Sequence, residues 1–186
     1  MEIKEAILKR RAYRSLEDVE ITEELVKDLT ECAQLAPSCF NNQPWRFVFV
    51  YDREELKLLC EALSQGNRWA HAASLIIAVF SKKDSDCLVK EREYFLFDTG
   101  MATAFIILRA TELGLVAHPI AGYSEGRVKD VLGIPEDAKV ITLVIVGTHS
   151  QELSPVLSEK QIESEKRRPE RLPLEKFMYI NRYQEV

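Results

Sequence analysis

The chain has 186 residues, of which 46% are hydrophobic and 30% charged, and this composition predicts one globular domain large enough to bury a core. Its formal net charge of -5 and its pI near 5.4 argue against a nucleic-acid partner, because neutralising phosphates requires a net basic face. The N-terminal residues lack the apolar run of a signal peptide, and no apolar stretch reaches membrane-spanning length. We therefore expect a cytoplasmic protein with no membrane partner.

The first half of the chain predicts helices and strands in alternation. Residues 3–11 can form a short helix, which runs into a cluster of arginines at positions 10, 11 and 14. Thr22 is a predicted N-cap for an amphipathic helix that must stop before Pro37, because proline lacks the backbone donor. Next comes a β-rich run at 45–51. Apolar residues recur at helical spacing over 53–64, which predicts a helix there, and an almost wholly apolar strand is predicted at 75–81.

The second half continues the alternation. Residues 98–113 predict a helix that is apolar nearly all round and ends at Gly114, which is typical of a helix in the core or in a subunit interface. A strand at 116–120, a helix at 125–132 and a strand at 140–147 complete the pattern. The order predicts a three-layer domain of the α/β or α+β class, with a mixed sheet of at least four strands between helices.

The composition changes at residue 150, where the chain becomes charged and interrupted by prolines. We therefore divide the sequence into a domain at 1–150 and a C-terminal arm at 151–186. The segment 172–180 carries more apolar surface than a solvated tail needs, so we expect the arm to dock on a partner subunit.

A polar loop lies between the helix that ends before Pro37 and the strand at 45–51. Its sequence places four polar side chains on irregular backbone, those of Ser38, Asn41, Asn42 and Gln43. Asparagine and glutamine offer a donor and an acceptor together, which suits a polyol or a flat heterocycle. The alternative is that these side chains satisfy the backbone of the turn itself.

The remaining reactive residue types form no recognisable catalytic motif. The four cysteines, Cys32, Cys39, Cys60 and Cys87, lack zinc or iron–sulfur spacing, so we expect most to be small core residues, with only Cys39 placed to touch a ligand. The three histidines are also scattered, which predicts hydrogen-bonded structural roles and no metal site. Neither a glycine-rich phosphate loop nor a nucleophile elbow occurs. An enzyme of this kind would depend on a bound organic cofactor.

Two further features could hold such a ligand. Arg10, Arg11 and Arg14 place three guanidinium groups within five residues, a pattern suited to a phosphate, although any one of them taken alone is better explained as a solvated helix end that complements the helix dipole. Arg171 has the same two interpretations. The turn that follows strand 116–120 contains Gly122, where backbone N–H groups could approach a planar ligand.

Four motifs in this order resemble the nitroreductase family of FMN-dependent oxidoreductases. They are R-R-x-x-R after the first helix, A-P-S-x-x-N-x-Q-P-W-x-F, D-x-G-x-A in the apolar helix, and P-I-x-G-Y. The resemblance covers almost the whole chain. It implies a three-layer α+β fold with a mixed, mainly antiparallel sheet, and a homodimer that exchanges C-terminal arms and binds FMN at its interface.

The resemblance also implies a role for each site residue. Arg10, Arg11 and Arg14 would hold the FMN phosphate and ribityl chain near the pyrimidine edge, with Arg171 as a C-terminal phosphate ligand. Pro37, Ser38, Cys39 and Asn41 would reach the flavin from the other subunit, while Gln43 and Trp45 shape the loop. Pro119, Ile120, Ala121 and Gly122 would lie against the isoalloxazine, and Asn67 would be a further candidate for a flavin contact.

The implied activity is electron transfer from NAD(P)H to a small-molecule acceptor, such as a nitroaromatic compound or a quinone, by a ping-pong mechanism. The chemistry would take place at flavin N5, so no protein side chain is expected to be catalytic. Other family members carry out dehalogenation, dehydrogenation or flavin modification, and a non-enzymatic flavin binder is a further alternative.

Overall fold

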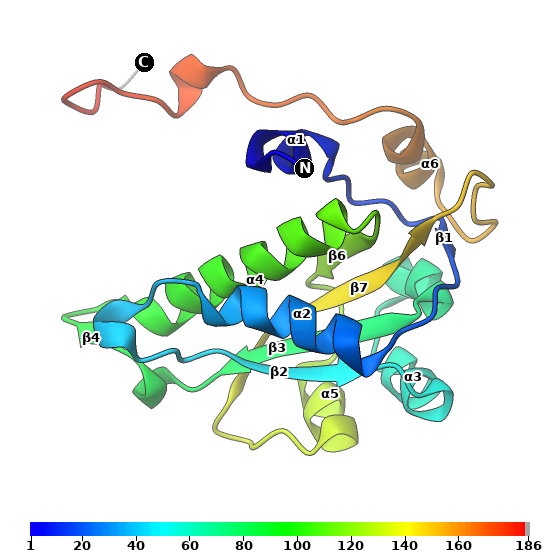
Figure 1. Cartoon of the computed structure of the whole chain (residues 1–186), viewed down its shortest axis with the longest axis horizontal. Helices are drawn as coiled ribbons and strands as arrows, with labels where there is room; N and C mark the ends of the chain where they lie inside the picture. Colours follow the sequence, from blue (N-terminus) through cyan, green and yellow to red (C-terminus); the bar gives the residue numbers. More distant parts are fainter. Residues whose placement is uncertain (185–186) are drawn as a thin grey trace.

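The computed structural model describes residues 1–184 and contains one α+β domain followed by an arm (Figure 1). The helices are α1 (Ile3–Lys9), α2 (Glu23–Gln34), α3 (Arg53–Cys60), α4 (Tyr94–Glu112), α5 (Glu125–Leu132) and α6 (Glu159–Lys166). The strands are β1 (Leu16–Glu17), β2 (Arg46–Val50), β3 (Leu75–Ser81), β4 (Leu88–Val89), β5 (Arg92–Glu93), β6 (Val116–Ile120) and β7 (Lys139–His149). Short 3-10 turns occupy Cys39–Asn41, Gln65–Ala72, Lys83–Ser85 and Leu174–Lys176.

The main sheet is built around β7, the longest strand. It pairs with β3 on one side and β6 on the other, β2 extends the sheet beyond β3, and β1 pairs with the C-terminal end of β7. A separate two-stranded hairpin joins β4 to β5. Every pairing between described residues is antiparallel, so the expected α+β class is confirmed and the parallel part of the mixed sheet is not found there.

The sheet is covered on both faces, which confirms the three layers. Figure 1 shows α2 and α4 on one face, with α3 and α5 on the other. Successive residues of a strand point to opposite faces, so Ile77 packs with α2 and α4 while its neighbour Ile76 packs toward α3 and α5. Burial on both faces explains why residues 75–79 read as one continuous apolar run.

Several expected boundaries shift, and several elements were not expected. Helix α4 begins at Tyr94, four residues before the predicted start at 98, and β7 extends two residues past 147. The sequence did not indicate β1, the 3-10 turn Gln65–Ala72, the β4–β5 hairpin or α6. Strand β1 pairs with the distant strand β7, and the 3-10 turn Gln65–Ala72 packs its buried Trp69 and Ala70 in the core, whereas the β4–β5 hairpin is a local pairing of residues 88–89 with 92–93. Helix α6 does have a local signal in the sequence, the capping box formed by Ser158 and Gln161.

The C-terminal arm packs on the domain only in its first part. Leu157 is buried against the α3 and α5 side of the core, and Ile162 of α6 packs there as well. After Pro169 the chain runs in an extended path past α1 (Figure 1), and the side chains of Leu172, Phe177 and Ile180 are exposed. Between residues 1 and 184, no helix is long and apolar enough to span a bilayer.

Candidate functional site

A cationic pocket lies where the segment that follows α1 meets the end of α6 and the part of the arm that comes directly after α6. Its cavity measures about 160 Å³. Five arginines line it together with Ala12, Ser164 and Pro169, namely Arg10, Arg11, Arg14, Arg168 and Arg171. No aspartate or glutamate is among the lining residues. The structure thus gathers all four arginines singled out in the sequence and adds a fifth, Arg168.

Hydrogen bonds from two of these arginines hold the pocket together. Arg168 donates from one guanidinium nitrogen to the carbonyl oxygens of Leu8 at 2.6 Å and Arg10 at 2.9 Å, which ties the arm to the end of α1. Arg11 donates to the carbonyl oxygens of Ser164 at 2.8 Å and Glu165 at 3.1 Å, at the end of α6. Residues far apart in sequence therefore form one wall. The sequence signal for Arg168 was its place in the basic run before Pro169.

The charge of the pocket is poorly compensated by the protein. Burial is the main cause that lowers the pKa of Arg10, and the neighbouring charges of Arg168, Arg171 and Arg11 lower it further. Burial likewise lowers the pKa of Arg14, against the attraction of Glu165. The Glu165 side chain is only 6% exposed and accepts hydrogen bonds from the backbone N–H groups of Arg14 and Ser15 at 2.7 and 3.2 Å. An anion with several acceptor oxygens, such as a phosphate, suits this pocket.

Two stacked aromatic rings, Trp69 and His118, lie against the segment that carries Arg14. The Arg14 guanidinium lies 5.9 Å from the centre of the Trp69 ring, and Trp69 stacks on His118 with 4.7 Å between ring centres. His118 Nδ1 lies 3.0 Å from the carbonyl oxygen of Tyr13. Burial lowers the pKa of His118 to about 4, so the ring is neutral at pH 7 and its Nδ1–H donates to that carbonyl. The predicted structural role of this histidine is confirmed.

The turn after β6 is tightly packed against the 3-10 segment. The Gly122 carbonyl accepts from the Asn67 side-chain Nδ2 and from the Ser64 backbone N–H, both at 2.9 Å. A Cβ at Gly122 would lie 2.5 Å from Ser64 Oγ and 2.6 Å from Asn67 Nδ2, so any other residue here would displace these two polar side chains. At the end of β6 Ile120 is buried and Pro119 is exposed, and Ala121, the first residue of the turn, is exposed. The Asn67 amide is thus already engaged in holding the turn.

The polar loop is anchored to α4 by Asp98, the aspartate of the D-x-G-x-A motif. Its carboxylate accepts the backbone N–H of Cys39 at 2.6 Å, and its side chain is 1% exposed. Within the loop, Ser38 Oγ accepts the Gln43 N–H at 3.0 Å, and Gln43 Nε2 donates to the Asn41 carbonyl at 3.2 Å. These bonds satisfy the turn itself, as the structural interpretation expected. No described residue hydrogen-bonds the exposed Asn41 side chain, which leaves it open to a ligand.

The sequence did not indicate that two of the four cysteines are bonded to each other, and the expected ligand contact of Cys39 stays a prediction. Cys39 and Cys87 form a disulfide, with Cα atoms 6.0 Å apart and 48 residues between them in sequence. Cys60 is buried, as predicted, and Cys32 is half-buried. Sequence spacing could not reveal the pair, because the tertiary fold brings the polar loop beside the segment that follows β3. Among described residues, the one group of close metal-ligand types is Cys39, Asp86 and Cys87, whose two sulfurs are bonded to each other.

Within one chain, the polar loop and the cationic pocket are far apart. Figure 1 shows the loop beside β4 at one end of the molecule, whereas the chain leaving α1 and the arm leaving α6 meet at the opposite end. Pro37, Ser38, Cys39 and Asn41 therefore do not lie with Arg10, Arg11, Arg14 and Arg171 in a single protomer. A ligand touching both groups needs two copies of the chain.

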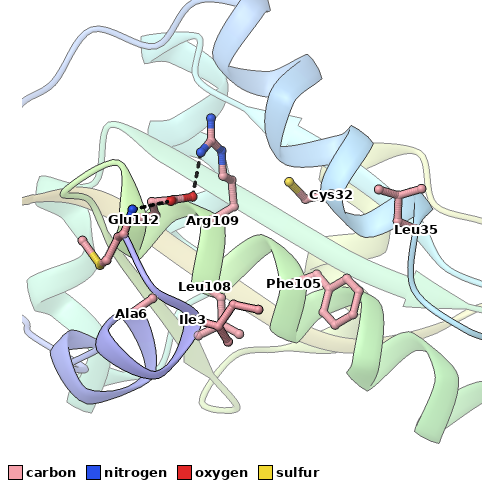
Figure 2. Close-up of a pocket in the computed structure, with 9 residues that line it drawn as sticks. Ile3, Ala6, Cys32, Leu35, Phe105, Leu108, Arg109 and Glu112 are labelled. Carbon is pink, nitrogen blue, oxygen red and sulfur yellow. Dashed lines mark hydrogen bonds and ion pairs between the residues drawn. The ribbon is translucent and has the colours of Figure 1, made fainter.

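A second cavity, of about 320 Å³, lies between α1, α2 and α4 (Figure 2). Ile3, Leu35, Phe105 and other apolar side chains form most of its lining. Both cationic groups of its lining are already paired: Arg109 contacts Asp28 and Glu112, each at 2.7 Å, and the N-terminal ammonium of Met1 contacts Glu112 at 3.3 Å. This cavity is therefore suited to apolar side chains and not to an anion.

The architecture and its pocket define a class of protein, a three-layer α+β domain with a cluster of arginines between its first helix and its C-terminal arm. Comparison with known proteins gives the family. The model of the nitroreductase family matches residues 7–68 and 61–148, and the chain belongs to that family.

Individual relatives agree with this assignment. A protein of Archaeoglobus fulgidus, named NADH dehydrogenase/NAD(P)H nitroreductase, is 34% identical over 145 residues, which cover 76% of this chain and 82% of the relative. A solved structure described as an oxidoreductase containing FMN matches with a TM-score of 0.84 and 30% identity, over 96% of this chain and 91% of its own. A nitroreductase family protein of Clostridium difficile shares the fold, with a TM-score of 0.80, 22% identity and coverage of 98% and 100%.

Proposed function

We propose that this protein is an FMN-dependent oxidoreductase. It takes electrons from NAD(P)H and passes them to nitroaromatic compounds, quinones or similar small acceptors. The two half-reactions follow a ping-pong order, in which the oxidised nucleotide leaves before the acceptor binds. Bound FMN would supply the hydride chemistry that no side chain of this protein offers.

The cationic pocket is the observation that carries the proposal. Five guanidinium groups line about 160 Å³ with no carboxylate among them, and their mutual repulsion and burial are reflected in the lowered pKa of Arg10. A phosphate monoester brings up to two negative charges and three acceptor oxygens, so it fits this donor set. The solved relative that contains FMN supports a flavin phosphate as the occupant.

The residues around the pocket have separate tasks in this proposal. Arg10, Arg11 and Arg171 would bind the phosphate, while Arg168 fixes the arm through its bonds to the end of α1. Arg14 lies further inward over Trp69, where its charge can face the pyrimidine edge of the ring and stabilise negative charge there. The Pro119–Gly122 turn would lie against the flat face of the ring.

We propose that the protein works as a homodimer, because the polar loop of one copy would complete the cationic pocket of the other. Apolar side chains are exposed on α1 and α4, with Ile3 at 74% and Phe97 at 63%, and the cavity in Figure 2 lies between these helices. The exposed residues of the arm, among them Phe177 and Ile180, supply a segment that can cover such a surface. Exchange of arms between the two copies would bury the exposed apolar side chains of the helices together with those of the arm.

The first test is the visible spectrum of the purified protein before and after anaerobic addition of NADH or NADPH. We expect a yellow protein that releases FMN on denaturation and is bleached by one of the nucleotides. Double-reciprocal plots of initial rate against nucleotide concentration, recorded at several fixed acceptor concentrations, should give parallel lines, as a ping-pong order requires. A protein that cannot be loaded with FMN would refute the proposal, and a loaded protein that no nucleotide bleaches would be a flavin binder without this activity.

A further inference from the structure

The disulfide between Cys39 and Cys87 ties two functionally different segments together. Cys39 lies in the polar loop, and Cys87 lies in the connector 82–93 between β3 and α4. Among the described residues, the hydrogen bonds between the two segments come from the Asn42 side-chain amide, which donates to Asp86 at 3.2 Å and to the Cys87 sulfur at 3.6 Å. Both cysteines are half-buried, so a small thiol can reach the bond.

The polar loop has a backbone that needs external restraint. Phe40, Asn41 and Gln43 have φ values of 48°, 59° and 49°, in the left-handed region that side chains other than glycine rarely adopt. The Phe40 side chain is 91% exposed, so packing of this ring does not hold the loop in place. The restraints come from the Asp98 bond to the Cys39 N–H, from the Ser38 bond to Gln43, and from the disulfide.

Asp98, which anchors the loop, lies where its ionised form is disfavoured. Burial raises the pKa of Asp98, and the adjacent Asp86 carboxyl raises it further, against the stabilising N–H of Cys39. One oxygen of Asp86 is buried without a hydrogen-bond partner among the described residues. Asp86 directly precedes Cys87, so the disulfide helps to hold the Asp86 carboxyl beside the loop that Asp98 anchors.

We propose that Cys39 and Cys87 form a thiol–disulfide exchange site whose redox state controls the conformation of the polar loop. The reductant is a dithiol, either a small molecule or a dithiol protein. Its thiolate attacks Cys39 Sγ, and the sulfur–sulfur bond breaks with its electron pair on Cys87 Sγ, which already accepts from the Asn42 amide. The second thiol of the reductant then displaces Cys39. The protein disulfide is reduced to two thiols, the dithiol is oxidised to a disulfide, and its two protons end on the cysteines.

The consequence concerns ligand binding and rests on the proposed function. In the oxidised form the loop is held with Ser38, Cys39 and Asn41 in place for the flavin of the partner subunit. In the reduced form the connector can separate from the loop, the two carboxyl groups can move apart, and the left-handed residues can relax. We therefore expect the reduced protein to bind FMN at least tenfold more weakly.

Two measurements test the exchange site without using flavin or activity. Thiol titration of the denatured protein should find two thiols after equilibration with oxidised glutathione and four after reduction with dithiothreitol. Limited trypsin digestion should cut the connector, which contains Lys90 and Arg92, at least several-fold faster in the reduced form. The double variant Cys39→Ser/Cys87→Ser should be cut at the faster rate with and without reductant. Four thiols in the oxidising buffer, or equal cutting in both states, would overturn the proposal.

FMN affinity, measured by quenching of flavin fluorescence without nucleotide, tests the link to binding. The affinity of the wild-type protein for FMN should fall tenfold or more on reduction, whereas the double serine variant should bind FMN weakly in both buffers. Cys32→Ser is the matched control, because Cys32 lies outside the loop and should leave the redox response unchanged. Equal affinity in both states would refute control of binding. Failure to bind FMN in either state, with the thiol and trypsin results as expected, would instead refute the proposed function.

Discussion

The contribution of Arg171 to the cationic pocket can be measured against a neighbour on the same arm. Arg171 lines the pocket, whereas Arg167 lies outside it and pairs with Glu170 at 3.3 Å. Arg171→Gln and Arg167→Gln remove the same charge from the same arm. A hydrogen bond between charged groups contributes about 1.5 to 3 kcal/mol. Because the Arg171 side chain is exposed, we expect the lower end, about 1.5 kcal/mol, which is roughly a tenfold increase in Kd for FMN.

The assay is a fluorescence titration of FMN with each variant at low and high salt. Arg171→Gln should show the tenfold loss at low salt and a smaller loss at high salt, because screening weakens a contact at an exposed side chain. Arg167→Gln should stay within twofold of wild type at both. Equal losses in the two variants would mean that only the net charge of the arm matters, and our placement of the phosphate would be wrong. Riboflavin, which lacks the phosphate, should bind both variants alike.

Three other positions give predictions with independent measurements. Arg14→Gln should lower the reduction potential of bound FMN while leaving the fold intact, and an unchanged potential in a redox titration would remove Arg14 from the pyrimidine edge. Folded His118 has a pKa of about 4 against 6.5 when unfolded, so protons bind the unfolded chain preferentially as the pH falls through this window. Between pH 6.5 and 4, the free energy of unfolding measured with denaturant should therefore fall by about 3 kcal/mol more for the wild-type protein than for His118→Asn. Parallel pH curves for the two proteins would contradict this. Gly122→Ala should destabilise by about 1 to 3 kcal/mol through its clash with the 3-10 segment, whereas Gly126→Ala, in an open position on α5, should stabilise by about 0.5 to 1 kcal/mol; thermal melts that shift the same way would refute the packing argument.

Local patterns in the sequence were sufficient for most elements of the domain. The N-cap at Thr22 and the αL glycine at Gly133 lie at the ends of helices, as their chemistry requires. The apolar run at 75–81 is the central strand β3 because both of its faces are covered. These features depend on a residue and its near neighbours, so they can be predicted without knowing the fold. The four motifs and their order carried the family for the same reason.

Contacts between distant residues were decided only by the tertiary structure. Arg168 joins the other arginines because the segment that follows α6 lies against the end of α1, and no local pattern places residues 158 positions apart in one wall. Asp98 was part of a motif, yet its bond to Cys39 exists because α4 passes beneath the polar loop. The pairing of Cys39 with Cys87 has the same origin. Sequence determined which chemical groups this protein has and which elements carry them, whereas the packing of helices on the sheet determined which groups meet, because such contacts depend on the path of the whole chain.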